Sequence, residues 1–318
     1  MRIDGKAMAD NILANLEQDI KRLKKRGIIP TLAVILIGDN PASLSYIKQK
    51  QKTTERIGAK LVLNALPLNT SLKLLKLLIK KLNDDPLVHG LIVQRPLPPE
   101  AGECGEILNL LNPAKDVDGL VPRPRFEAPV SKAVLKILEQ VYKLNPQSSI
   151  RQLTDKAQRS NQDPNPNDQF LNWLRSKQVV VVGRGETAGK AIASLLQKQH
   201  CTTSIIHSQT PHPKKILQQA DIVISCVGKK RVVKATMIKP GLILIGVGIW
   251  RDSDGKLHGD YEEEEIKDIA SFYTPTPGGV GPLNVACLME NLIQAALNES
   301  DQFTNPTNLP IKRKIKEF

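Results

Sequence analysis

A repeated change between two hydrophobic periodicities is the feature that most constrains the fold. Segments of strand length, such as the continuous apolar run Thr31–Ile37 and the predicted strand Val88–Gln94, alternate with segments such as Ser71–Asn83, whose apolar residues recur at helical spacing. Strands that are apolar on both faces and separated by helices are typical of parallel sheets covered by helices. The alternation therefore predicts an α/β fold.

The same alternation resumes after a long polar interruption. Turn-forming residues dominate 143–176, which we expect to be a surface insertion. At 318 residues the chain exceeds the usual size of a single hydrophobic core, so two domains are expected. The strand-like runs beyond the interruption are Gln178–Val182, Thr203–His207, Asp221–Cys226 and Leu242–Val247.

Composition argues against several classes of protein. The four cysteines include no C-x-x-C pair, so neither a disulfide framework nor a metal site is expected. No apolar run approaches the roughly 18 residues of a membrane span, which predicts a cytoplasmic protein with no membrane partner. The net charge of +13 would suit nucleic acid as well as anionic small molecules. With 3% aromatic residues, however, the chain lacks stacking side chains, and no nucleic-acid partner is expected.

A glycine-rich turn follows the first strand-like run of the second half. Gly183, Arg184 and Gly185 lie between that run and a helical pattern at Ala188–Gln199. Glycines in this context let the backbone approach a pyrophosphate at a helix N-terminus. The turn predicts dinucleotide binding, with a purely structural tight turn as the alternative.

The segment after the next strand bears on which dinucleotide binds. NAD-binding proteins usually carry Asp or Glu about 20 residues beyond the glycines, to hold the ribose hydroxyls. Here 206–210 contains no carboxylate, Ser208 can donate to a phosphate, and Arg184 offers a guanidinium. We expect NADP rather than NAD; alternatively, Arg184 is a solvated loop residue and Ser208 a turn former.

Polar residues in the first half suggest a second site. Tyr46 and Lys50 would lie one turn apart on a helix, although spacing alone favours a solvated face. Gln94 ends a buried strand, where sites form in α/β proteins. Asp116 and Asp118 lie on a predicted turn. Each also has a structural interpretation, as a strand cap or as turn residues.

Taken in order, these segments resemble the methylenetetrahydrofolate dehydrogenase/cyclohydrolase family over nearly the whole chain. Besides Tyr46, Lys50 and Lys52, the matching segments are Ile3–Lys6, Gly38–Ser43, Val93–Pro98, Lys115–Leu120, Gly183-Arg184, His207-Ser208, Gly259-Asp260 and Thr274–Pro282.

The resemblance implies an N-terminal α/β substrate domain, a Rossmann-like NADP-binding domain and a C-terminal helix that returns to the first domain. Accordingly, 1–125 should bind folate and catalyse, together with the helix 282–298. A linking helix and the insertion would fill 126–177, the NADP-binding domain 178–281, and a basic tail 299–318.

The family's site residues carry over position by position. Lys50 matches the catalytic lysine and Gln94 the glutamine that tunes it. Tyr46 matches a tyrosine that stacks on the folate ring system, Asp118 the aspartate that grips the pterin, and Ser43 a serine near the reacting water.

Further expectations concern the amine and the cofactor. Burial, together with the neighbouring cation Lys52, should lower the pKa of Lys50. The expected cofactor-binding residues are Gly183, Arg184, Gly185, Ser208, Gly228 and Ile249; Pro277, Gly278 and Gly279 are expected to bind substrate.

The implied activity is oxidation of methylenetetrahydrofolate with NADP, followed by hydrolysis of the methenyl product to formyltetrahydrofolate, by a cytoplasmic homodimer. The chain departs from the family at Gly185 (usually Ser), Gly246 (usually Asp), Asn284 (usually Thr) and 128–131. These positions lie on the cofactor side or in the domain link. Alternatives are therefore a cyclohydrolase with weak dehydrogenase activity, a non-catalytic folate- and NADP-binding homologue, and an amino-acid or hydroxy-acid dehydrogenase.

Overall fold

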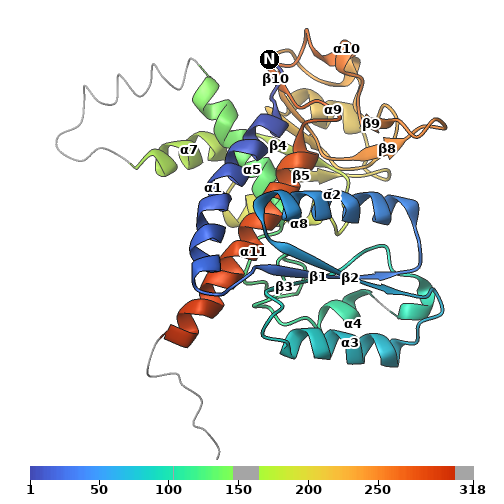
Figure 1. Cartoon of the computed structure of the whole chain (residues 1–318). Coiled ribbons are helices and arrows are strands. Elements are labelled where there is room, and N and C mark those ends of the chain that lie inside the picture. The colour runs from blue at the N-terminus through green and yellow to red at the C-terminus, as the bar shows by residue number, and fades with distance from the viewer. Residues whose placement is uncertain (103, 146–164, 305–318) are drawn as a thin grey trace, which may run out of the picture. The chain divides into compact units, whose positions relative to one another are not determined.

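The apolar runs of the first half form a parallel sheet in the computed structural model, which describes residues 1–102, 104–145 and 165–304. Every residue of its central strand is buried, as expected of a strand with helices on both faces. Figure 1 shows α2 and α3 on opposite sides of this sheet. The strand order is β2 (Lys60–Leu66), β1 (Thr31–Ile37), β3 (Gly90–Val93); α2 is Pro41–Ile57 and α3 is Leu72–Asp84.

Helix α2 begins and ends at residues suited to those positions. The Asn40 side chain accepts hydrogen bonds from the backbone N–H groups of Ala42 and Ser43, and Pro41 occupies the first turn. Gly58 ends the helix with a φ of 79°, which favours glycine. These caps fix both ends of the helix that carries Tyr46 and Lys50.

The second half forms a parallel sheet of its own, which confirms the predicted α/β class. In its strand order β4 lies between β5 and β6. The next strand in sequence, β5, pairs with one side of β4, and β6 then pairs with the other side. Ligands in such sheets bind beyond the carboxyl ends of the strands at this switch point. The order is β10 (Phe272–Tyr273), β7 (Ile243–Gly246), β6 (Ile222–Ser225), β4 (Val179–Val182), β5 (Thr203–Ile206).

The remaining described elements complete the chain. The antiparallel hairpin is β8 (Ile249–Arg251) with β9 (Leu257–Gly259). The other helices are α1 (Gly5–Lys25), α4 (Cys104–Leu108), α5 (Pro129–Leu144), α7 (Pro166–Arg175), α8 (Gly189–Lys198), α9 (Pro213–Gln219), α10 (Glu263–Ile266) and α11 (Val280–Thr304), with short 3-10 turns at Pro99–Ala101 and Ala235–Met237.

Two compact units make up the chain. The five-strand unit comprises Met1–Asn11 and Glu127–Cys287, and the three-strand unit comprises Ile12–Phe126 with the described residues from Leu288 onward. The linking helix α5 thus belongs to the five-strand unit. Most of the predicted insertion, 146–164, and of the basic tail, 305–318, lies outside the described residues.

Residues 1–11 belong to the five-strand unit, whereas the predicted domain boundaries placed them with 12–125. Arg2 forms a parallel β-bridge with Tyr273, and the N–H of Ile3 donates to the carbonyl of Tyr273 at 2.8 Å. The N–H of Lys6 donates to the carbonyl of Gly278 at 2.9 Å. Backbone pairing therefore ties this segment to the five-strand unit.

Helix α11 is longer than predicted but carries Pro282 in its first turn, as expected. Within the three-strand unit, the Asn291 side chain donates to the carbonyl of Val117 at 2.9 Å, so the helix returns to the first domain as predicted. Among the described helices, α11 is the one that is long and apolar enough to span a membrane, over Val280–Ser300. Two thirds of that apolar window is buried, which is typical of a core helix.

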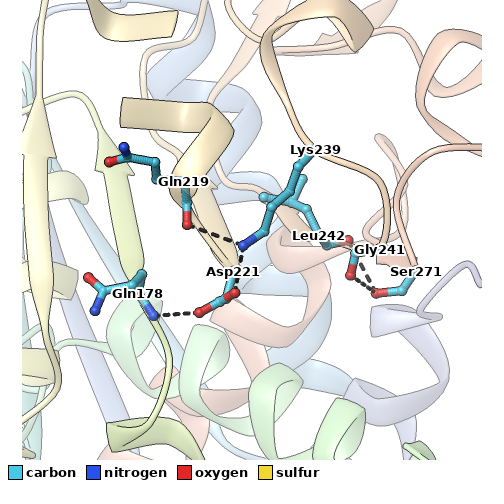
Figure 2. Close-up of polar contacts among 7 residues, drawn as sticks. All are labelled: Gln178, Gln219, Asp221, Lys239, Gly241, Leu242 and Ser271. Atoms are coloured by element: carbon cyan, nitrogen blue, oxygen red, sulfur yellow. Dashed lines mark hydrogen bonds and ion pairs between the residues drawn. The ribbon is translucent and has the colours of Figure 1, made fainter. Parts of the chain in front are cut away.

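Asp221 fastens the amino edge of the five-stranded sheet. Its carboxylate accepts from the N–H of Gln178, which precedes β4, at 2.9 Å, and from Lys239 Nζ at 2.7 Å. Lys239 also donates to the carbonyl of Gln219 at the end of α9, as Figure 2 shows. Burial by itself would raise the pKa of Asp221, but the bonds from Gln178 and Lys239 outweigh it and lower that pKa.

We expect Asp221→Asn to lower the free energy of unfolding by about 1 kcal/mol near neutral pH, the upper end for a partly exposed ion pair. Because the folded pKa of Asp221 lies below its unfolded value of about 3.9, this stabilisation is present above the unfolded pKa. It is lost as the pH falls through the folded pKa. Denaturant unfolding at neutral and acidic pH measures the change. Asp19→Asn, in an exposed pair with Arg22, is the control; an equal loss in both variants would contradict the role of Asp221.

Candidate functional site

Lys50 and Gln94 meet at the carboxyl edge of the three-stranded sheet. Lys50 lies on α2, which follows β1, and its Nζ donates to Oε1 of Gln94 at 3.1 Å. Part of the Lys50 side chain is accessible, yet protein surrounds the amine closely enough for desolvation to dominate its pKa. Burial lowers the pKa of Lys50, the charge of Asp118 raises it, and the charge of Arg95 lowers it further, with a net lowering.

Backbone contacts fix the orientation of the Gln94 amide. The Gln94 N–H donates to the carbonyl of Ile35 in β1 at 2.9 Å, which extends the sheet by one residue. The side-chain Nε2 donates to the carbonyl of Arg95 at 2.9 Å. Because the amide nitrogen is engaged there, Oε1 is the atom presented to Lys50.

Ser43 is buried, with 2% of its surface exposed, at the start of α2. Its hydroxyl donates to the same carbonyl of Arg95 at 3.4 Å. Ser43 and Gln94 therefore converge on one backbone oxygen, and the structure brings Ser43, Lys50 and Gln94 together. The convergence on Arg95 was missed from sequence, because nothing local marks that carbonyl.

The two carboxylates of the turn after α4 have different surroundings. Asp116 is fully buried, and its Oδ2 accepts from the N–H groups of Leu120 and Val121 at 2.7 and 2.9 Å. Burial raises the pKa of Asp116 despite these bonds. Asp118 is half-buried, and its charge acts on Lys50. Asp116 thus holds the turn closed, and Asp118 is the carboxylate of this turn whose charge raises the pKa of Lys50.

The cation expected beside Lys50 was assigned wrongly. Lys52 is exposed on α2, and the positive charge that lowers the pKa of Lys50 is that of Arg95. Residues two apart on a helix do not face one another, whereas Arg95 follows β3 next to Gln94. Tyr46 lies one turn before Lys50 on the same helix and is 39% exposed.

The glycine turn of the five-strand unit connects β4 to α8. Gly183 has a φ of 104°, and a Cβ on it would lie 3.0 Å from the carbonyl oxygen of Cys226. A Cβ on Gly189, a position not singled out from sequence, would lie 2.1 Å from the carbonyl oxygen of Gly183. Gly189 therefore lets the helix begin directly against the turn. Gly185 is exposed and has open space around it.

The other predicted cofactor residues follow neighbouring strands of this sheet. Arg184 and Ser208 are exposed beyond the ends of β4 and β5, which pair directly. Gly228 lies beyond β6 with a φ of 73°, and a Cβ on it would lie 2.9 Å from the carbonyl oxygen of Ile249. Gly183 and Gly228 flank the switch point between β4 and β6, where an α/β sheet binds its ligand.

The Pro/Gly loop belongs to the five-strand unit, whereas Lys50 and Gln94 belong to the three-strand unit. Gly278 has a φ of 103°. A Cβ on Gly279 would lie 2.5 Å from the carbonyl oxygen of Pro275, and a Cβ on Gly5 would lie 2.0 Å from the carbonyl oxygen of Gly279. Close backbone packing therefore requires these glycines and holds Pro277 and its neighbours in place.

Both halves of the chain match models of known domains. Residues 3–118 match the tetrahydrofolate dehydrogenase/cyclohydrolase catalytic domain, and residues 170–300 match the NAD(P)-binding domain of the same proteins. The chain belongs to the tetrahydrofolate dehydrogenase/cyclohydrolase family. This membership confirms the resemblance inferred from the motifs.

Relatives match over nearly their full length. The bifunctional protein FolD of Halalkalibacterium halodurans is 40% identical over 294 residues, covering 92% of this chain and 98% of that protein. The crystal structure of the bifunctional enzyme FolD from Campylobacter jejuni shares 33% identity with a TM-score of 0.81, covering 94% and 99% of the two chains. The crystal structure of the Trypanosoma brucei methylenetetrahydrofolate dehydrogenase-cyclohydrolase (FolD), complexed with NADP cofactor and inhibitor, shares 28% identity with a TM-score of 0.79. The match covers 94% of this chain and 98% of that chain.

One departure from the family pattern has a structural counterpart. A Cβ on Gly246, where the family usually has Asp, would lie 3.0 to 3.2 Å from the ring and hydroxyl of Tyr261. Tyr261 is buried, and its hydroxyl donates to the carbonyl of Thr274 at 2.5 Å. The tyrosine therefore fills the space that a larger residue at 246 would need.

The electrostatics of Lys50 predict how its pKa responds to substitution. Asp118→Asn should lower the pKa of Lys50 further, Arg95→Gln should raise it, and Lys52→Gln should leave it unchanged. NMR titration of ¹³C-labelled lysine side chains, with the Lys50 signal assigned by its loss in Lys50→Met, measures these shifts. A shift in Lys52→Gln as large as in Arg95→Gln would contradict the assignment of the cation.

Proposed function

We propose that this family member oxidises methylenetetrahydrofolate with NADP and hydrolyses the methenyl product to formyltetrahydrofolate. The observation that carries the proposal is the desolvated amine of Lys50, bonded to Gln94 and acted on by Asp118. An amine whose pKa is lowered towards neutrality can both take and return a proton. This is the chemistry that hydrolysis of a methenyl cation requires.

Residues of the five-strand unit fit NADP. The turn from β4 to α8 has open space at Gly185, so a pyrophosphate can approach the backbone there, while Gly183 allows the turn to pack closely against the carbonyl of Cys226. Arg184 and Ser208 can hold the additional phosphate, and no carboxylate in 206–210 repels it. Bound NADP supplies the hydride acceptor for the oxidation.

Residues of the three-strand unit would handle the folate. We assign Tyr46 to stacking on the folate ring system and Asp118 to hydrogen bonds with the pterin. Lys50 accepts one proton from the attacking water and gives it to the ring nitrogen as the C–N bond breaks. The second proton of the water leaves the adduct hydroxyl for solvent as the formyl carbonyl forms, and Gln94 holds the amine in position. Ser43 steadies the carbonyl of Arg95, and through it the Gln94 amide. In the five-strand unit, Pro277, Gly278 and Gly279 are assigned to substrate binding.

Gly185 favours a second possibility, a cyclohydrolase with weak dehydrogenase activity. The family usually has Ser at this position, and the glycine removes a hydroxyl donor from the cofactor turn. No residue expected to bind folate has been replaced in this way. The folate-side residues that match the family are Tyr46, Lys50, Gln94 and Asp118.

The proposal extends to assembly and location. We assign the active form as a cytoplasmic homodimer, with folate and NADP as its ligands and neither membrane nor nucleic acid as a partner. The burial of α11 supports a core helix over a membrane anchor. The low aromatic content, 3%, supports the absence of a nucleic-acid partner.

Substitution of the proposed acid–base residue tests the function. We expect Lys50→Met to slow hydrolysis of methenyltetrahydrofolate by about 10²- to 10⁴-fold, the usual contribution of a positioned acid–base group. The decay of methenyl absorbance measures the rate. Lys52→Met, which removes an exposed lysine of the same helix, is the matched control and should retain the wild-type rate. Equal rates in wild type and Lys50→Met would refute the proposal.

Restoring the missing hydroxyl tests the cofactor turn. Since a Cβ on Gly185 meets open space, we expect Gly185→Ser to fold normally. One added hydrogen bond should tighten NADP binding by about 2- to 10-fold. Calorimetric titration with NADP gives the affinity. Gly255 is also an exposed turn glycine, but its φ of 78° would strain a serine, so Gly255→Ser is not used as the control. Gly105→Ser, which also has open space, serves instead; equal gains in both variants would contradict a specific contact.

A further inference from the structure

Asp260 carries a fully buried carboxylate directly after β9, at a position given no role above. Its Oδ2 accepts from the hydroxyl of Ser225 at 2.6 Å and from the N–H of Val227 at 2.9 Å. Its Oδ1 accepts from the N–H groups of Gly228 and Lys229 at 2.7 and 3.0 Å. Both oxygens of the carboxylate are therefore engaged by one short segment.

The donors form an anion-binding nest at the carboxyl end of β6. Val227, Gly228 and Lys229 direct successive N–H groups at one point, an arrangement that commonly binds phosphate in α/β proteins. Here the chain's own carboxylate is the anion. These N–H groups are thus not available to a dinucleotide phosphate, which leaves the turn from Gly183 to Gly189 to bind it.

The 226–229 loop lies between two parts of the proposed cofactor site. On one side the carbonyl of Cys226 packs against Gly183, and on the other Gly228 packs against the carbonyl of Ile249. Both contacts leave no space for a Cβ, so displacement of the loop would move its neighbours. The shape of the switch point therefore depends on what holds the 226–229 loop.

We propose that Asp260 is a positioning residue for NADP binding, which holds the 226–229 loop by occupying its amide nest. The inference rests on the proposed function, because it assigns NADP to the carboxyl edge of this sheet. The carboxylate also acts electrostatically on the same loop. Burial raises the pKa of the Cys226 thiol, and the negative charge of Asp260 raises it further.

Gly248 gives an independent way to disturb the same contact. A Cβ on Gly248 would lie 2.3 Å from Oδ2 of Asp260 and 2.4 Å from the nitrogen of Gly228. Gly248→Ala would therefore intrude between the carboxylate and its nest without changing any hydrogen-bonding group. It should reproduce the effect of altering Asp260.

The test compares Asp260→Asn with wild type in NADP binding and in methenyltetrahydrofolate hydrolysis. The amide presents an NH₂ group to donors that had faced an oxygen, so at least one pair of bonds is lost. We expect the NADP dissociation constant to rise at least ~10-fold. Hydrolysis, which uses Lys50 and Gln94 of the three-strand unit, should stay within about 2-fold of wild type. Asp221→Asn, at the opposite edge of the same sheet, is the matched control and should bind NADP as wild type does.

Rescue by a small anion separates positioning from general stability. Asp260→Gly leaves the nest empty, and formate can replace the missing carboxylate. NADP affinity of this variant should recover in sodium formate but not in sodium chloride of equal ionic strength. If Asp260→Asn fails to fold, this comparison and Gly248→Ala decide the question.

The outcomes separate this inference from the function on which it rests. Wild-type protein that neither binds NADP nor reduces it with methylenetetrahydrofolate would overturn the proposed function. Wild-type protein that does both, with Asp260→Asn or Gly248→Ala binding NADP within about 2-fold of wild type, would overturn the role of Asp260 alone. Loss of NADP affinity with hydrolysis retained, and recovery in formate, would support it.

Discussion

Parallel strand pairing decides where the polar residues of this chain lie. In a parallel sheet all carboxyl ends share one edge, so side chains that follow different strands meet there although they are distant in sequence. Lys50 and Gln94, 44 positions apart, come together after β1 and β3 in this way. Gly183 and Gly228 do the same after β4 and β6. Burial of every residue of β1 and β4 stabilises the pairing on which both arrangements depend.

The amine of Lys50 illustrates how a fold adjusts the acidity of one group. Removing an ammonium from water disfavours its charged form, and the nearby guanidinium of Arg95 acts in the same direction. The carboxylate of Asp118 opposes both, which keeps the amine protonatable. The Gln94 oxygen accepts a hydrogen bond from either protonation state, so the position of the amine need not change as the proton moves.

Hydrophobic periodicity was sufficient to predict the α/β class and the positions of the longer parallel strands, because such strands are apolar enough to leave a strong local signal. The ends differ by one or two residues, as in β3 (Gly90–Val93 against the predicted Val88–Gln94), and the two-residue β10 was missed. It could not distinguish Asp116 from Asp118, since only the folded turn shows which carboxylate is used by the N–H groups of Leu120 and Val121. The neighbouring cation was assigned to Lys52 by proximity in sequence, whereas Arg95 arrives from another strand. Likewise, the backbone pairing of Arg2 with Tyr273 involves residues 271 positions apart and has no local signature.

The packing of Tyr261 against Gly246 has a consequence for which substitutions the two positions tolerate. An acid placed at 246 would crowd the tyrosine ring, while a smaller residue at 261 would lose the bond to Thr274 and open a void. We therefore expect either change alone to lower the free energy of unfolding. The two positions are therefore coupled: a larger side chain at 246 and a smaller one at 261 would be accommodated together more easily than either change alone.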